Sequence, residues 1–344
     1  MGAYPSLPFN EQLQINCYSM LKDGDDLFAV IKWADKYPEL RDMIGSECER
    51  RNSVKAITLM FHTGGIICKI LYKKREFLLD LVETRDDWLD GNIIAKPEHP
   101  TSCKYLMKES SNPTAIVIKY FMQLFRVPTL HEVSFLNPTT SIIDYCIGFP
   151  EIFTARRMLI EKEKDSVSRW ELEFIGDEFK NLAKVHLSAE IPEEYKLWPM
   201  KYTCVCLEIR SSVTGADLAT FKGERLDVRD PLTTTEMNRF IKIWLVTKIK
   251  VEIINCYNTL NNGDLFDGLE TYPWDKKARG KYYPMKHDED VVVANCRNCM
   301  DIYRDDGTLA SIHFDAKKKR MSFFVWKERF PMLPRNYSIM FMQH

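Results

Sequence analysis

The sequence has no excess of charge of either sign. Its 344 residues include 48 Lys or Arg and 49 Asp or Glu, which leaves a formal net charge of −1. A protein that binds nucleic acid normally carries a basic excess or a basic stripe, so we expect no nucleic-acid partner. The one dense basic run, Lys317-Lys318-Lys319-Arg320, lies between two strand-like segments. It is interpreted first as a solvated turn, and second as a nuclear signal or phosphate-binding patch.

Long apolar runs and a dense cysteine framework are also missing. The longest apolar stretch, Ala115 to Phe125, is interrupted by Lys119 and Gln123, and it is shorter than the roughly 20 residues of a membrane span. Ten cysteines are too dilute for a disulfide scaffold, and Met1 to Gln14 shows no secretory signal pattern. We therefore expect no membrane partner, and reduced thiols in a cytoplasmic or nuclear protein.

One terminal pattern leaves an alternative open. The first six residues, Met1 to Ser6, fit the loose N-myristoylation pattern. Chance satisfies this pattern easily, and no polybasic patch follows to supply the second signal that stable membrane anchoring requires. The sequence therefore does not decide N-terminal lipidation.

Recognisable catalytic motifs are absent. The sequence has no Gly-rich phosphate loop, no Gly-x-Ser-x-Gly elbow and no His-Glu-x-x-His helix. Cys296 and Cys299 form a CxxC, but structural zinc needs four ligands, and in a β-rich run residues three apart point to opposite faces. We expect no enzymatic activity, no cofactor and no metal site. A hydrolase or transferase with an unrecognised site is the least favoured alternative.

The N-terminal part has helical periodicity. Apolar residues recur at helical spacing from Leu13 to Leu21 and from Leu27 to Ala34, with the helix breaker Asp23-Gly24-Asp25 between them. A third short apolar set ends at Ile44. This pattern predicts a small helical element over residues 1–50, which is too small to bury all its apolar faces without a partner surface.

From Val54 the pattern becomes that of strands. Two β-rich runs joined through Thr63-Gly64-Gly65 predict a hairpin. Near the other end, Asp305-Asp306-Gly307 between β-rich runs predicts an antiparallel meander. Residues 258–290 are rich in Asn, Gly, Asp and Lys and predict a long surface loop, and residues 331–344 form a C-terminal tail.

The centre of the chain contains a recurring β-like core. Six such cores begin about 25, 27, 22, 19 and 25 residues apart, close to the 20–29 residues of leucine-rich repeats, at Val133, Met158, Val185, Leu207, Leu226 and Val251. Helix-compatible segments lie between most of them, the best being Thr233 to Val246, where Thr233 and Glu236 form a capping box. The fold class predicted is α/β (α+β overall). Residues 51–330 are expected to form an irregular, leucine-rich-repeat-like solenoid with β-hairpins at its ends.

Several strings resemble a known family. The segments Ser211 to Leu218, Leu232 to Trp244, Asp301 to Ile312 and Phe323 to Trp326 look like the nematode F-box-associated domain of type 2. The similarity runs from about Val54 to Trp326. In that family the N-terminal element is an F-box, which binds the Skp-type adaptor of a cullin ubiquitin ligase.

The resemblance implies a role and a set of adaptor contacts. Leu7, Pro8 and Leu27 match the adaptor-facing pattern of an F-box, whereas Trp33-Ala34-Asp35 replaces the usual polar and basic helix end. The implied function is that of a substrate-recognition subunit, in which ubiquitin transfer is carried out by other subunits. The alternative is a protein-interaction solenoid with a degenerate F-box and no ligase contact.

Strand alternation predicts the surface that would bind the target protein. The strand positions expected to face away from the helices carry mixed charge, which suits a protein partner. The candidate target-binding residues are Glu132, Arg157, His186, Glu208, Arg225, Asp227, Arg229 and Glu252. If this face is solvated, reversing the charges of Arg225, Asp227 and Arg229 should weaken target capture and leave thermal stability almost unchanged.

Overall fold

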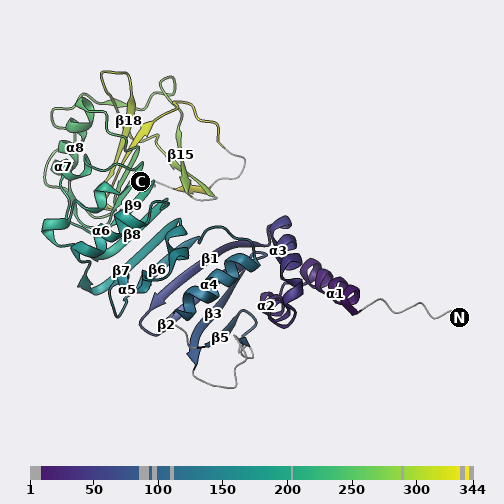
Figure 1. Cartoon of the computed structure of the whole chain (residues 1–344). Helices are drawn as coiled ribbons and strands as arrows, with labels where there is room; N and C mark the ends of the chain where they lie inside the picture. Colours follow the sequence, from purple (N-terminus) through teal and green to yellow (C-terminus); the bar gives the residue numbers. More distant parts are fainter. Residues whose placement is uncertain are drawn as a thin grey trace. The chain divides into compact units, whose positions relative to one another are not determined.

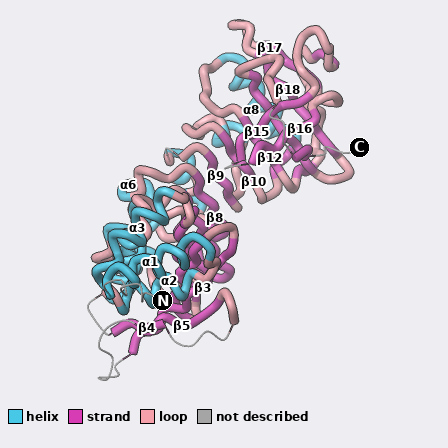
Figure 2. Tube along the Cα trace, turned by 90° about the vertical axis from the view of Figure 1, so that its right-hand side faces the viewer, coloured by secondary structure: helices cyan, strands magenta, loops and turns pink. Residues whose placement is uncertain are grey.

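Mixed helices and strands make up the chain in this computed structural model. The structure describes residues 9–84, 93–94, 99–108, 112–202, 204–287, 290–333 and 338–340. Internal contacts divide the chain into two compact units, Met1–Glu161 and Lys162–His344, whose elements are labelled in Figure 1. Both units combine helices with sheet (Figure 2), which confirms the predicted α/β class. The boundary between the units falls inside residues 51–330, which the sequence analysis treats as one domain.

Three short helices open the first unit, as predicted. They are α1 (Phe9–Asp23), α2 (Leu27–Lys36) and α3 (Arg41–Arg50), with the 3-10 turn η1 (Pro38–Leu40) before α3. The Asp26 carboxylate accepts hydrogen bonds from the backbone N–H groups of Phe28 and Ala29, at 2.9 and 3.2 Å, and so caps α2.

These helices share a core with the sheet that follows. The Phe28 ring meets the Phe77 ring edge-on at 5.2 Å. The Lys73 ammonium, in the turn after the second strand, donates to the carbonyls of Leu21 and Gly24 at 2.8 and 2.6 Å. Carbonyls at the C-terminal end of α1 are thus satisfied by a residue of the turn between two strands, and the helices and the first strands belong to the same compact unit.

The first unit is built on a mixed sheet. β1 (Val54–His62), β2 (Gly65–Tyr72) and β3 (Arg75–Thr84) form an antiparallel meander. The predicted hairpin at Gly64-Gly65 is therefore confirmed, and Gly65 has φ +143°, a conformation that favours glycine.

Further strands extend this meander. The strand β5 runs parallel to β3 and antiparallel to β4, while β6 runs parallel to β1, and β7 runs parallel to β6. Their bounds are β4 (Ile93–Ile94), β5 (Ser102–Lys108), β6 (Glu132–Leu136) and β7 (Arg157–Ser166). The remaining helices of the unit are α4 (Pro113–Leu124), α5 (Ile142–Cys146) and the 3-10 helix η2 (Pro150–Thr154).

The second unit contains four parallel strands followed by an antiparallel set. The strand order is β8-β9-β10-β12-β19-β18-β17-β14, with β8 to β12 parallel and the rest antiparallel. The bounds are β8 (Lys184–Glu190), β9 (Cys206–Ile209), β10 (Arg225–Val228), β12 (Ile253–Cys256), β14 (Tyr272–Pro273), β17 (Met300–Tyr303), β18 (Leu309–Asp315) and β19 (Arg320–Trp326). The predicted C-terminal meander with its turn at Gly307 is confirmed.

Helices of the second unit lie beside these strands (Figure 1). They are α6 (Arg169–Glu178), α7 (Gly215–Leu218) and α8 (Thr234–Val246), with 3-10 turns η3 (Glu193–Tyr195) and η4 (Pro199–Lys201). The Thr233 hydroxyl accepts from the Glu236 N–H at 3.1 Å, as expected for an N-cap. The Glu236 carboxylate, however, accepts from the Gly215 N–H at 2.6 Å and so joins α8 to α7.

Two adjacent residues of β19 define the two faces of this sheet. The Phe323 ring contacts Phe240 and Trp244 of α8, both at 5.3 Å, whereas the Phe324 ring contacts Tyr283 at 5.0 Å on the other side. Tyr283 belongs to a small sheet of β15 (Tyr282–His287), β16 (Asp290–Asn295) and β20 (Ser338–Met340). One face is therefore covered by helices, and part of the other by the small sheet.

The predicted long loop over residues 258–290 is wrong. This segment contains β14, the whole of β15, and β13 (Thr259–Leu260), which pairs with β11 (Leu232–Thr233). It also contains Arg279, which is fully buried. The polar composition of this segment predicted a loop. The sequence does not show that Arg279 is buried beside an equally buried carboxylate, Asp301.

The inward residues of the first five recurring segments are confirmed, since none is more than 1% exposed: Val133, Phe135, Met158, Ile160, Val185, Leu187, Leu207, Ile209, Leu226 and Val228. The sixth segment is shifted by one residue. Val251 is buried as predicted, at 1% exposed, but it precedes the strand, and within the strand Ile254, not Ile253, is fully buried. The N–H groups of Glu252 and Ile253 both donate to the Glu224 carbonyl, at 2.7 and 3.0 Å. This irregularity inserts one residue and exchanges the faces.

No helix of the part of the chain that the structure describes is long and apolar enough to cross a membrane.

Candidate functional site

The face of the second sheet opposite the helices carries a continuous row of polar side chains, which we call the polar row. Strand register places its members next to one another across six strands: His186, Glu208, Asp227, Asn255, Ser322 and His313. In-register pairing, parallel from β8 to β12 and antiparallel from β12 to β18, produces this row because each strand contributes the residue at the same height.

Hydrogen bonds connect most of the polar row. One carboxylate oxygen of Glu208 lies 3.0 Å from His186 Nδ1, and the other accepts from Arg229 Nε at 2.5 Å. Asn255 donates its amide N–H to Asp227 at 2.7 Å. The Ser322 hydroxyl donates to Asn255 Oδ1 at 2.9 Å. These bonds hold His186 with Glu208, and Asp227 with Asn255 and Ser322, in fixed positions, which is the preorganisation that a recognition surface needs.

Charge on this face is largely neutralised in pairs. The Arg225 guanidinium binds the Asp227 carboxylate, with Nη2 at 2.8 Å and Nε at 3.0 Å. Burial by itself raises the pKa of Glu208, but hydrogen bonds and charges of His186 and Arg229 outweigh it and lower the pKa to about 2. Glu208 is therefore ionised throughout the physiological pH range.

Asp227 is not the solvated residue that strand alternation predicts. Its exposed fraction is only 3%, and it accepts hydrogen bonds from both Arg225 and Asn255. Reversing its charge would bury a cation beside Arg225 and leave both donors without an acceptor, which costs stability. The expectation that a triple reversal including Asp227 and Arg229 leaves stability unchanged is therefore wrong at Asp227.

A cavity of about 530 Å³ opens at the amino ends of the parallel strands. Its floor includes Cys206, Arg225 and Ile253, and its wall includes Tyr283 and Pro284 of the small sheet. Most of its lining is apolar, with charged groups at intervals, as in sites that receive a side chain of a partner. Burial raises the pKa of the Cys206 thiol to about 12, and the charge of Asp227 adds to this effect.

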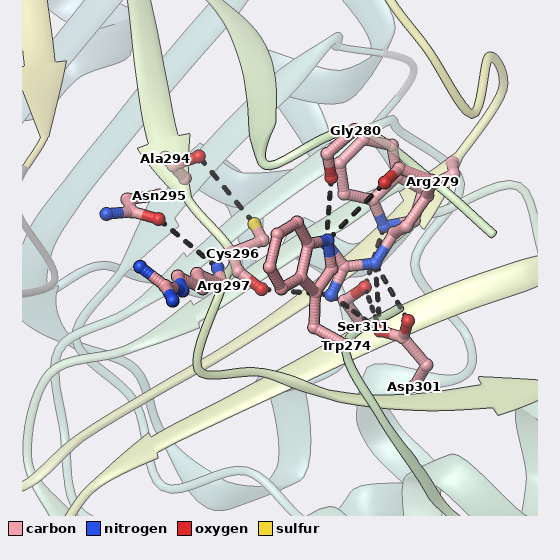
Figure 3. A network of polar contacts seen from close by, with 10 residues as sticks. Trp274, Arg279, Gly280, Ala294, Asn295, Cys296, Arg297, Asp301 and Ser311 are labelled. Atoms are coloured by element: carbon pink, nitrogen blue, oxygen red, sulfur yellow. Dashed lines mark hydrogen bonds and ion pairs between the residues drawn. The ribbon is translucent and has the colours of Figure 1, made fainter. Parts of the chain in front are cut away.

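A buried ion pair anchors the segment that leads into the small sheet (Figure 3). Arg279 donates to Asp301 from Nε, at 2.9 and 3.0 Å, and from Nη2, at 2.7 Å; Nη2 also donates to the Cys296 carbonyl at 2.9 Å. The Ser311 hydroxyl donates to Asp301 at 2.7 Å, and Trp326 Nε1 donates to Ser311 at 2.7 Å. Because every carboxylate and guanidinium contact is internal, this network positions the cavity wall and is not itself open to a ligand.

The predicted target-binding residues divide between the two units. Glu132 and Arg157 are neighbours on β6 and β7 in the first unit. His186, Glu208, Arg225, Asp227 and Arg229 are brought together on the polar face of the second unit, and Glu252 lines the cavity and forms an ion pair with Lys327.

Three other residues of this face were not predicted from the sequence: Asn255, Tyr257 and Ser322. The one-residue shift in β12 hid the first two. Ser322 lies on β19, which was predicted as part of a separate meander and which pairs with β12 in the structure.

The predicted adaptor contacts are only partly described. Leu7 and Pro8 lie outside the described residues. Leu27 is fully buried, so in this structure it stabilises the helices and does not present a surface to a partner, contrary to expectation. Ile15 of α1, by contrast, is 52% exposed and is an apolar side chain that a partner can reach.

The CxxC pair lies in a turn between β16 and β17 and not in a strand, with the Cys299 N–H donating to the Cys296 carbonyl at 3.2 Å. Both cysteines are buried and free, and burial raises the pKa of Cys296 well above its usual range. Within the described residues, no group of three or more His, Cys, Asp or Glu side chains could hold a metal ion.

Comparison with known proteins gives one partial match. A stretch of 68 residues is 37% identical to an uncharacterized protein of Caenorhabditis elegans; it covers 19% of this chain and 16% of that protein. No family model matches the chain, and no solved structure matches it. A match of this extent assigns no family, so the F-box resemblance stays a prediction.

Proposed function

We propose that the chain is the substrate-recognition subunit of a Skp–cullin–F-box type ubiquitin ligase and binds its target protein through the polar face of the second unit. The observation that carries this proposal is the polar row beside a largely apolar cavity. The row positions hydrogen-bonding groups, and the cavity can accept an apolar side chain of the target, a combination typical of protein interfaces. In this proposal the chain has no catalytic role, and other subunits transfer ubiquitin.

The recurring strands support the repeat-like part of the proposal. In the second unit, β8, β9, β10 and β12 are parallel, in register and separated by short helices or turns. Such stacking leaves one sheet face for binding while helices cover the other. We therefore interpret this region as an irregular leucine-rich-repeat-like arrangement that the antiparallel strand β19 closes at one end.

The adaptor contact can be tested with two isoleucines of closely matched exposure. Ile15 lies on α1 and is 52% exposed; Ile116 lies on α4 of the same unit and is 54% exposed. Ile15→Glu should abolish co-purification of the full chain with a Skp-type adaptor because it places a charge in an apolar interface. Ile116→Glu serves as the matched control and should bind normally. Adaptor binding by both variants would exclude α1 as the docking helix.

Failure of the unmodified chain to bind any Skp-type adaptor would favour the second candidate, a protein-interaction module with a degenerate F-box. The burial of Leu27 is the observation that favours this candidate, since an F-box needs that side chain at its surface according to the resemblance.

Target binding can be tested separately by photo-crosslinking in cells. A benzophenone amino acid at Val205, which is half-exposed at the cavity rim, should crosslink to a target protein. The same amino acid at Trp170, exposed on α6, is the matched control on the helix-covered side and should not. Equal crosslinking at both positions would contradict the assignment of the binding face.

A further inference from the structure

A second group of residues lies one position beyond the carboxyl ends of the parallel strands. The N–H groups of Arg210, Arg229 and Tyr257 donate to the carbonyls of the preceding strand, at Leu187, Ile209 and Val228, with lengths of 3.0, 2.9 and 3.1 Å. These three residues therefore continue the hydrogen bonding between the parallel strands, and they lie side by side at one end of the sheet.

Tyr257 joins two arginines at this end. The guanidinium carbons of Arg229 and Arg320 lie 3.9 and 4.9 Å from the centre of its ring. Cation–π contact favours the guanidinium positions over the ring, so both cations are held in place. Arg320 begins β19, which runs antiparallel to β12, and this direction brings the start of β19 to the carboxyl end of β12.

The basic run of the sequence reaches the same end. Lys317, Lys318 and Lys319 form the turn between β18 and β19 directly before Arg320, and the Lys319 carbonyl accepts from the Thr259 N–H at 2.7 Å. We call the whole group the basic edge: Arg210, Arg229, Lys317, Lys318, Lys319 and Arg320.

Carboxylates pair with part of the basic edge. Glu208 accepts from Arg229, and Asp315 lies 3.9 Å from the Lys318 ammonium. Arg210 is exposed, and no carboxylate of the described residues forms an ion pair with it. In a chain whose net charge is −1, this local excess of positive charge is a feature of one place and not of the whole surface.

From this arrangement we infer that the basic edge binds an acidic segment of a partner protein, with side-chain carboxylates of the segment paired to Arg210 and its neighbours. Arginine pairs with a carboxylate through two parallel hydrogen bonds, so the exposed guanidinium of Arg210 favours this class of ligand. The inference deepens the proposed function, on which it rests, because it names the chemistry of the target.

A protein ligand fits the basic edge better than a nucleic acid does. Proteins that bind single strands combine a basic groove with aromatic rings on which bases stack. Here the ring of Tyr257 is already in contact with two guanidinium groups, so it offers no stacking platform. Nucleic-acid binding is therefore a competing outcome for the experiment to decide.

The experiment measures fluorescence anisotropy of a labelled Glu/Asp-rich dodecapeptide with the full-length chain. The variant Arg210→Glu/Lys317→Glu should bind the peptide about tenfold more weakly because attraction is replaced by repulsion at two positions. The matched control is Lys222→Glu/Lys250→Glu, which changes the same charge at two exposed lysines at the amino ends of the strands and should bind normally. Thermal melting of both variants should match that of the parent.

Two results would overturn the inference. Equal weakening of peptide binding by both double variants would show that net charge alone attracts the peptide. Stronger binding of a single-stranded oligonucleotide than of the peptide would show that the ligand is a nucleic acid and not an acidic protein segment. The proposed function fails differently. If the Val205 photo-crosslink captures a target but the acidic peptide does not bind, only the inference about acidic chemistry is lost. If the peptide binds but no target crosslinks at Val205, the proposed binding face is lost.

Discussion

Removing Asp301 from its buried ion pair should strongly destabilise the second unit. Arg279 is fully buried and Asp301 is 1% exposed, so Asp301→Leu leaves a guanidinium without a counter-ion in the interior. Breaking a buried pair in this way costs about 3–5 kcal/mol. A unit of about 180 residues loses roughly 2–4 °C per kcal/mol, so the melting temperature should fall by about 6–20 °C.

A second substitution separates the ion pair from the packing around it. In the double variant Arg279→Met/Asp301→Leu no buried charge remains, and more than half of the loss should be recovered. Recovery should stay incomplete because the Cys296 carbonyl and the Ser311 hydroxyl lose partners. The two single variants and the double variant together form a cycle that measures the coupling between the two side chains.

The assay is thermal unfolding followed by circular dichroism, with chemical denaturation as a second measurement. The control is Arg169→Met, which removes an exposed ion pair with Glu173 and should move the melting temperature by no more than about 1–2 °C. A shift of similar small size for Asp301→Leu would refute the reasoning, since it would mean that water reaches the guanidinium.

Two further predictions concern the polar face. Because the folded pKa of Glu208 is about 2, below its ordinary value of 4.5, its ionised form contributes stability above pH 4.5 that is lost as the pH falls toward 2. The difference in unfolding free energy between the parent and Glu208→Gln should therefore shrink over that interval in denaturant titrations, and a constant difference would contradict the assignment. Cys206, with a pKa of about 12, should react with iodoacetamide far more slowly at pH 7 than free cysteine does. Mass spectrometry of the modified peptide measures this rate. Rapid modification would show that the thiol is not shielded.

Local sequence patterns were sufficient to predict those elements in which a single periodicity or a short turn motif dominates. The Gly64-Gly65 hairpin, the helix after Thr233 and the turn at Gly307 all follow from a few neighbouring residues. The inward side chains of five recurring segments were also predictable, because alternation over three residues already separates a buried face from a polar one. The existence of a polar face, with His186, Glu208 and Arg229 on it, followed from the same alternation.

Contacts between distant segments decided the details that local patterns left undetermined. The segment Val251-Glu252-Ile253-Ile254 has apolar residues at both odd and even positions, so alternation does not decide which of them face inward. Its register depends instead on two N–H groups, of Glu252 and Ile253, that share the Glu224 carbonyl. That contact places Asn255 beside Asp227 and so completes the polar row.

The sequence by itself determined which segments alternate, which residues cap or break them, and therefore the α/β class and one polar face. Only the tertiary structure decided that Asp227 is buried, that a small sheet held by Arg279 and Asp301 covers part of that face, and that the basic run, through Arg320, meets Arg229 at the ring of Tyr257. The physical reason is that periodicity is a property of neighbours along the chain. Burial of a charge, by contrast, depends on partners that can lie far away in sequence. Arg279 pairs with a carboxylate 22 residues away, and Asp227, besides its nearby partner Arg225, accepts from an amide 28 residues away.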